Sequence, residues 1–219
     1  MARVVPFHEL SGSGSALPGE LTISLGAELA PLDVAQLDAA LKPLVSDLAT
    51  LREADPIEQL LAIEAILPRH LRAEPRSRRD LGLSDLLPHA VARRRRGHEL
   101  SVALVALEAA SRAGLQLSLV ACPTAVFLAH PDAGVPVLLA ASPEWELVDA
   151  RQIDDPELSW QRGHEAASLL LDLILTRARE TGHLTAELRA AELCLDLPVE
   201  GEELARLETQ LAMVRSRLN

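Results

Sequence analysis

The sequence contains very few aromatic residues: two Phe, two Trp and no Tyr in 219 positions. A core with so few rings has to be built from Leu, Ala and Val, and because Leu and Ala are strong helix formers, this composition favours a largely helical fold. Apolar residues make up 48% and charged residues 24%, which are ordinary values for a globular protein and exclude wholesale disorder. The length allows one large domain or two small ones.

Cysteines and long apolar runs are also scarce. Cys122 and Cys194 are too far apart for a metal-binding motif and too few for a disulfide framework. No run approaches the roughly 18 apolar residues of a membrane-spanning helix, and the first residues contain no apolar stretch of signal-peptide length. These features predict a protein of the reducing cytoplasm with no metal and no other cofactor.

Basic residues are in the minority, since 21 Lys and Arg stand against 32 Asp and Glu, for a formal net charge of −11. Nucleic-acid-binding proteins usually carry a basic excess that neutralises phosphates, and an anionic membrane surface repels an acidic protein. The basic run Arg93–Arg96 ends a predicted helix, where arginines complement the negative end of the helix dipole. We therefore expect a protein partner or a homo-oligomer, with no nucleic acid and no membrane.

The hydrophobic pattern divides the chain into three parts. Residues 1–31 are the least regular, and the alternating segment Leu21–Leu25 predicts a short strand. Residues 32–159 begin with helical periodicity, in which Pro43 predicts a kink or a break, and continue with short strands separated by turn residues. Residues 160–219 are helical again, as in a helical hairpin.

The expected elements give an α+β fold. The predicted helices cover residues 32–51, 55–68, 84–96, 98–113, 160–182, 184–195 and 202–218. The predicted strands cover residues 115–121, 125–130, 135–141 and 144–148. The links between the strands are short, which predicts a small antiparallel meander.

Two packing arrangements follow from this order of elements. The helix after Gly97 should place the side with Val102, Leu104, Val105 or Leu107 on a sheet made from residues 115–149, because its apolar face has no other nearby cover. Residues 160–218 should pack on the core and leave apolar surface for a partner.

The segment Arg93–Leu115 reads RRRRGHELSVALVALEAASRAGL, and a strand and Cys122–Phe127 follow it. This segment resembles the bacterial SirB-type proteins, a branch of the transglutaminase-like superfamily. The features that carry the resemblance are, in this order, an arginine run, a Gly, a Ser at a helix start and a closing Gly-Leu pair. The resemblance extends over residues 33–217, and Gly182–Pro198 is similar to the tetratricopeptide-like tail of that family. It implies a transglutaminase-like (papain-like) core.

The resemblance also implies where a catalytic site would lie. In the superfamily a nucleophile at the start of a buried helix gives its proton to a His on a neighbouring strand, and an Asp on the next strand orients that His. By spacing, these positions fall on Ser101, on Ala125 or (with a one-residue slip) Val126, and on Asp149. The chain therefore has Ser in place of the reactive Cys and no His at the base position, which is a degenerate triad.

Other residues offer alternative chemistry. His98 precedes the helix of Ser101, and His130 ends the strand of Ala125 but points to the opposite face by strand alternation. We interpret both as surface or capping histidines, Ser101 as a cap or as a buried hydroxyl that faces Asp149, and Cys122 as a small buried hydrophobic residue.

The function predicted from the sequence is a pseudoenzyme: a non-catalytic transglutaminase-like domain that serves as a protein-interaction or regulatory module. The alternative is a serine-type hydrolase or acyl-transferase that uses Ser101 with His98 or His130 as a substitute base. A third, weaker possibility is an acidic scaffold with an oligomeric role.

Overall fold

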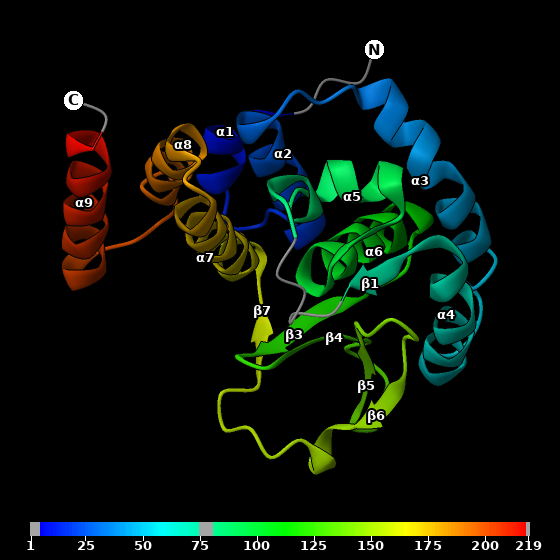
Figure 1. Ribbon diagram of the computed structural model, residues 1–219. Coiled ribbons are helices and arrows are strands. Elements are labelled where there is room, and N and C mark those ends of the chain that lie inside the picture. Colours follow the sequence, from blue (N-terminus) through cyan, green and yellow to red (C-terminus); the bar gives the residue numbers. More distant parts are fainter. Residues whose placement is uncertain (1–4, 75–80, 218–219) are drawn as a thin grey trace.

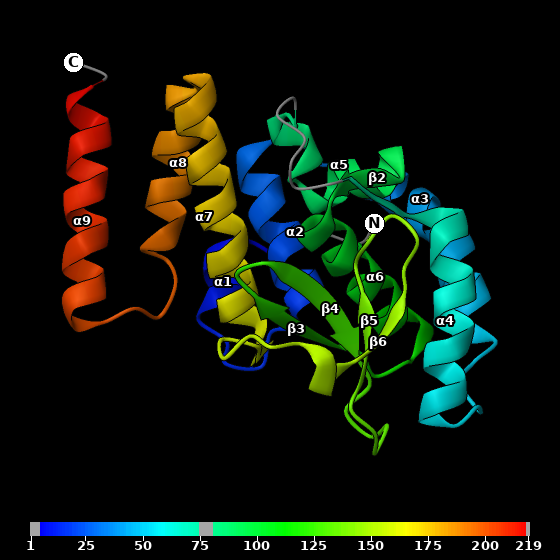
Figure 2. The ribbon, with the colours of Figure 1, turned by 60° about the horizontal axis from the view of Figure 1, so that its bottom comes forward.

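The computed structural model describes residues 5–74 and 81–217 and is shown in Figure 1. A small antiparallel sheet lies under a group of helices that includes α2, α5 and α6, and the C-terminal helices α7, α8 and α9 stand in a row at one side (Figures 1 and 2). The α+β class is confirmed, with most of the described chain in helices. Residues 1–4 of the expected irregular segment, and residue 218 of the last predicted helix, lie outside the described residues.

The elements have the following bounds. The helices are α1 Phe7–Ser11, α2 Pro18–Leu29, α3 Val34–Ala49, α4 Pro56–His70, α5 Pro88–Arg94, α6 Glu99–Ala113, α7 Gly163–Thr181, α8 Leu184–Cys194 and α9 Gly201–Ser216, with short 3-10 turns η1 Leu83–Asp85 and η2 Ala150–Gln152. The strands are β1 Arg72–Glu74, β2 Arg96–His98, β3 Ser118–Cys122, β4 Ala125–Ala129, β5 Val137–Ala140, β6 Leu147–Asp149 and β7 Ser159–Gln161.

The prediction of a strand at Leu21–Leu25 is wrong, because these residues lie in helix α2. The apolar residues of the alternation are buried, but Thr22 and Ser24 between them are buried as well. Their hydroxyls donate to backbone carbonyls, Thr22 to Pro18 at 2.6 Å and Ser24 to Val5 at 2.6 Å. Since α2 is enclosed by α6, α7 and α5, its polar positions do not mark a solvent face.

Two prolines that were expected to break or bend helices lie inside continuous ones. Pro43 is within α3 and Pro68 within the last turn of α4. Helix α3 begins at Asp33, whose carboxylate accepts from the backbone N–H groups of Ala35 and Gln36. Its buried stripe then runs past Pro43 and consists of Leu37, Leu41, Leu44 and Leu48. Burying four leucines outweighs the one backbone hydrogen bond that a proline removes.

The predicted helix over 84–96 is shorter in the structure. The turn η1 covers its beginning, α5 starts only at Pro88, and the chain leaves the helix at Arg95, which has a φ of 57°. Gly97 is therefore not the helix stop. It lies in β2, where an added Cβ would collide with the side chain of Val91 and come within 2.7 Å of the Asp85 carbonyl oxygen.

Helix α6 lies at the centre of the core. Val102, Leu104, Val105 and Leu107 are all buried, and the helix packs on β3 and β4 as well as on α2, α3 and α5. Gly114, with a φ of 80°, ends it. The expected contact between this helix and the sheet is confirmed.

The sheet has the strand order β6-β5-β4-β3-β7, and all its neighbours are antiparallel. The four predicted strands and their meander are confirmed; each strand is shorter than predicted, and β3 and β6 end one residue later. Strand β7 occupies residues that were expected to start a helix, so α7 begins only at Gly163.

Alternate residues of the sheet face two different hydrophobic clusters. The inner cluster contacts α6 and includes Leu119, Val126, Leu128 and Leu139. The outer cluster consists of Val120, Cys122, Phe127, Ala129 and Leu138.

The three predicted C-terminal helices are present and pack in sequence. Helix α7 lies against α2 and α8, and α8 lies against α9. The buried residues of α9 are Leu207, Leu211 and Val214. In the part of the chain that the structure describes, no helix combines the length and the apolar character needed to cross a membrane.

Candidate functional site

The start of α6 is fixed by the strand pair β1 and β2. These strands are parallel, with Glu74 opposite His98. His98 is the N-cap of α6, and its Nδ1 accepts from the backbone N–H of Leu100 at 3.2 Å. Ser101 follows in the first turn of the helix, where the resemblance described above implies a nucleophile.

The hydroxyl of Ser101 is fully buried and is already in use. Ser101 Oγ donates to the carbonyl oxygen of Leu86 at 2.7 Å. Leu86 lies between η1 and α5, so the hydroxyl ties this connection to the first turn of α6. The expectation of a buried hydroxyl holds, but its partner is Leu86, not Asp149.

The two candidates for the base position point to opposite faces of the sheet. Ala125 is paired with Cys122 and packs on the outer cluster, away from α6. Val126 belongs to the inner cluster, which contacts α6. A base that serves a nucleophile on α6 has to lie on the inner face, and of the two candidates Val126 is the one on that face.

Asp149 lies at a different place in the sheet. It pairs with Val137 on β5, and by the β4–β5 register Val137 lies opposite His130. Asp149, Val137 and His130 therefore lie side by side across three neighbouring positions of the sheet. His130 is four residues after Val126, which is about 13 Å along the strand at ~3.3 Å per residue. The backbone N–H of Ala141 donates to the carbonyl of Val126, so Ala141 is the inner-face neighbour of Val126. The structure therefore does not bring Asp149 together with Ser101, Ala125 or Val126.

The carboxylate of Asp149 is instead engaged by Arg151. Its Oδ2 accepts from Arg151 Nη2 at 2.6 Å, and its Oδ1 accepts from the Arg151 backbone N–H at 3.0 Å. The hydrogen bonds from Arg151 lower the pKa of Asp149. This pair closes the turn after β6.

The two candidate substitute bases both act in backbone turns. His98 caps α6, and His130 Nδ1 accepts from the backbone N–H of Asp132 at 3.1 Å. Both side chains are buried, so the interpretation as capping residues fits and the surface interpretation is wrong. Within the described residues, neither imidazole makes a hydrogen bond to Ser101.

An open groove of about 360 Å³ lies beside the start of α6. Its walls come from α6, the β3–β4 turn and α7, and include His98, Leu100, Cys122, Val126, Asp172 and Leu173. Sequence reasoning missed Asp172 and the α7 wall, because α7 is distant in sequence and only the fold brings it here. Ser101 is not among the described residues that line this groove.

Cys122 is buried, with 8% of its surface exposed. Its Sγ contacts Thr124 Oγ1 at 3.4 Å and the carbonyl of Ala125 at 3.7 Å, and it packs in the outer cluster as expected for a small hydrophobic residue. Among the residues that the structure describes, no group of three His, Cys, Asp or Glu side chains is arranged to hold a metal ion.

A comparison with protein families finds a match over more than half of the chain. A family model described as the transglutaminase-like superfamily matches residues 34–155, which extend from α3 through α6 to the loop after β6. No curated protein and no solved structure matches the chain.

Proposed function

Because the chain belongs to the transglutaminase-like superfamily, we propose that it is a non-catalytic member that works as a protein-interaction or regulatory module. We place it in the SirB-type branch, with α7, α8 and α9 as the tetratricopeptide-like tail. The arginine run, Gly97, Ser101 and Gly114 support this placement, since Gly97 fits closely against Val91 and Gly114 supplies the positive φ that ends α6. The partner that we propose is a protein.

The observation that carries the proposal is the hydrogen bond from Ser101 to Leu86. A serine nucleophile needs an accessible oxygen beside a base that can take its proton. Here the proton of Ser101 is donated to a carbonyl oxygen at 2.7 Å, and the side chain has no exposed surface. This arrangement is that of a structural hydroxyl.

The neighbouring positions support the same conclusion. Val126 is one of the two expected base positions and Ala141 is its inner-face neighbour, and neither side chain can accept or donate a proton. They are 4% and 3% exposed, so they belong to the hydrophobic core.

One observation favours the alternative, a serine-type hydrolase or acyl-transferase. His98 is three residues before Ser101 and lines the groove beside α6. For His98 to activate Ser101, the Ser101–Leu86 hydrogen bond has to break and the η1–α5 connection has to move. The chemistry therefore requires a conformation different from the one described.

Labelling with acyl and peptide-ester probes tests the proposal. We expect mass spectrometry to find Ser101 unmodified. Ser101→Ala should lower the free energy of unfolding by about 1–3 kcal/mol, because the carbonyl of Leu86 is left unpaired in the core. Ser111→Ala, at an exposed site on the same helix, is the matched control and should change it by less than about 0.5 kcal/mol. Stoichiometric acylation of Ser101 that Ser101→Ala abolishes would overturn the proposal and establish the alternative.

A further inference from the structure

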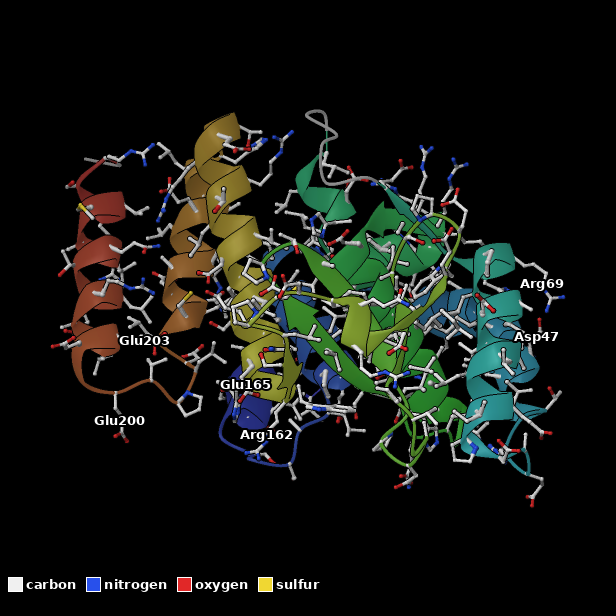
Figure 3. The ribbon with its side chains drawn as sticks, turned by 90° about the horizontal axis from the view of Figure 1, so that it is seen from below. Asp47, Arg69, Arg162, Glu165, Glu200 and Glu203 are labelled. Atoms are coloured by element: carbon white, nitrogen blue, oxygen red, sulfur yellow. The ribbon has the colours of Figure 1, made fainter. Side chains whose placement is uncertain are left out.

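The outer face of the five-stranded sheet, which points away from α6, carries a surface that has no role in the candidate site described above. The inner face packs on α6, whereas the outer cluster is overlaid in the described structure by the β6–β7 connection (Figures 1 and 3). In Figure 3 the sheet is seen from this side, and Arg162 and Glu165 mark the start of α7 next to it. Only Ala150, Ile153 and Leu158 of the connection pack on the outer cluster.

A hollow of about 370 Å³ opens between this connection and the β4–β5 loop. Its floor is formed by sheet residues and its rim by residues of the two loops and β7. The residues that matter here are Val120, Leu138, Val135, Pro136, Leu158 and Trp160. The lining is mostly apolar, with His130 and Ser159 as its polar residues, which suits an aliphatic side chain or a proline ring.

Trp160 is the most prominent residue at the rim. It pairs with Val120 of the outer cluster, so its side chain is on the outer face, and it is 56% exposed. Val135 across the hollow is 48% exposed. The other tryptophan, Trp145, is fully buried, and its indole N–H donates to the carbonyl of Leu71 at 3.0 Å. An exposed Trp beside an apolar hollow is the kind of residue that dominates binding energy in protein interfaces.

The charge around the hollow selects the partner. The two loops that border the hollow, residues 130–136 and 149–158, contain five acidic side chains and one Arg, for a formal charge of −4 out of −11 for the whole chain. The one Arg, Arg151, is paired with Asp149. Asp132, Asp154 and Glu157 are exposed on the two loops that border the hollow, each within a few residues of a lining residue. A second copy of this chain would bring the same negative charge and be repelled, whereas a basic segment would be attracted.

We propose that the hollow beside Trp160 is the docking site for a basic, extended segment of a partner protein. An apolar side chain of that segment enters the hollow and packs on Trp160, and flanking Lys or Arg side chains lie over Asp132, Asp154 and Glu157. The inference rests on the proposed function, because it gives the protein-interaction module its surface and the chemistry of its partner.

Fluorescence anisotropy with a short labelled peptide of Lys-Pro-Leu repeats tests this site. We expect the peptide to bind the full chain, and two comparison peptides, one with Glu in place of Lys and one with Ser in place of Leu, to bind at least about tenfold more weakly. Binding should weaken as salt is added, since the rim charges are exposed. Absence of binding, or equal binding of the Glu peptide, would overturn the proposal.

Matched variants locate the binding on the protein. Trp160→Ser should weaken binding at least about tenfold, while Leu61→Ser, at a site on α4 that is 52% exposed, should leave it unchanged. The triple variant Asp132→Asn, Asp154→Asn and Glu157→Gln should weaken binding and flatten its salt dependence. The control removes three exposed charges from the region of α9 by Glu200→Gln, Glu202→Gln and Glu208→Gln. Equal losses in both triple variants would show non-specific attraction and refute the site.

Two further outcomes separate this inference from the proposed function. If gel filtration shows a dimer that Trp160→Ser converts to a monomer, a second copy occupies the hollow and the proposal of a basic partner is wrong. If the peptide fails to bind and Ser101 also resists acyl probes, the docking site is refuted while the non-catalytic assignment stands. Circular dichroism of each variant shows that a loss of binding does not come from unfolding.

Discussion

Removing the two arginines around Glu187 should destabilise the protein more than removing the charge of Glu187 itself. Glu187 on α8 is 1% exposed. Its carboxylate accepts from Arg179 Nε on α7 at 2.9 Å and from Arg217 Nη1, just after α9, at 2.9 and 3.1 Å. This one buried anion therefore joins all three C-terminal helices.

The magnitudes differ because the two sides of the interaction differ in exposure. Arg179 and Arg217 have side chains that are 44% and 50% exposed, so they regain water when the carboxylate is neutralised. Glu187→Gln keeps the shape and should cost about 1–2 kcal/mol. The double variant Arg179→Ala and Arg217→Ala leaves an ionised carboxylate in the core without a partner, which should cost about 3–5 kcal/mol.

Urea unfolding followed by far-UV circular dichroism measures both changes. Adding Glu187→Gln to the double variant should restore part of the lost stability, because the isolated charge is removed. The control is Arg215→Ala, since Arg215 is 59% exposed and pairs with a more accessible carboxylate, Glu192. A double variant that costs no more than Glu187→Gln would refute the argument that burial makes this carboxylate depend on its arginines.

Three further predictions concern the core. Gly19→Ala should lower the free energy of unfolding in urea by about 2 kcal/mol, because the new Cβ would lie 2.8 Å from the backbone nitrogen of Glu108. The control Gly14→Ala meets no atom within 4 Å and should lower it by less than about 0.5 kcal/mol. Equal effects of the two variants would contradict the close approach of α2 and α6. Burial, with a contribution from a nearby arginine, lowers the pKa of His89 from its ordinary value of 6.5. The contribution of neutral His89 to stability should therefore be fully present above pH 6.5 and be lost as the pH falls below it. His89→Leu should remove this part of the pH dependence of the free energy of unfolding. Burial raises the pKa of Cys194 to about 12, so iodoacetamide should alkylate it only after denaturation, and mass spectrometry that finds it modified in the native protein would refute this.

The elements that sequence analysis predicted well are those with one dominant period. Helix α6 has clear end signals at His98 and Gly114, and the four predicted strands are bounded by Pro, Gly and Asp. Helix α2 could not be predicted, because its apolar alternation at Leu21–Leu25 is produced by burial on all sides. Strand β7 was also missed, since its three residues form a strand only through pairing with β3.

The site was harder to predict than the fold, because the position of a strand residue depends on pleat and register. A shift of one residue exchanges Ala125 on the outer face for Val126 on the inner face. Spacing along the chain selected Asp149, but the sheet register places it about four residues away from the row that faces the start of α6. The sequence carries no signal for either choice, since both depend on which strands become neighbours.

The apolar residue at the expected base position is consistent with the packing around it. Val126 is 4% exposed and lies on the inner face at the wall of the groove, where a buried imidazole would need a hydrogen-bond partner. Ser101 meets the same requirement by donating to Leu86. His98 and Leu100 line the groove beside α6 whereas Ser101 is not among its described lining residues, so restoring catalysis would require releasing the Ser101 hydroxyl from Leu86 and placing a base beside it.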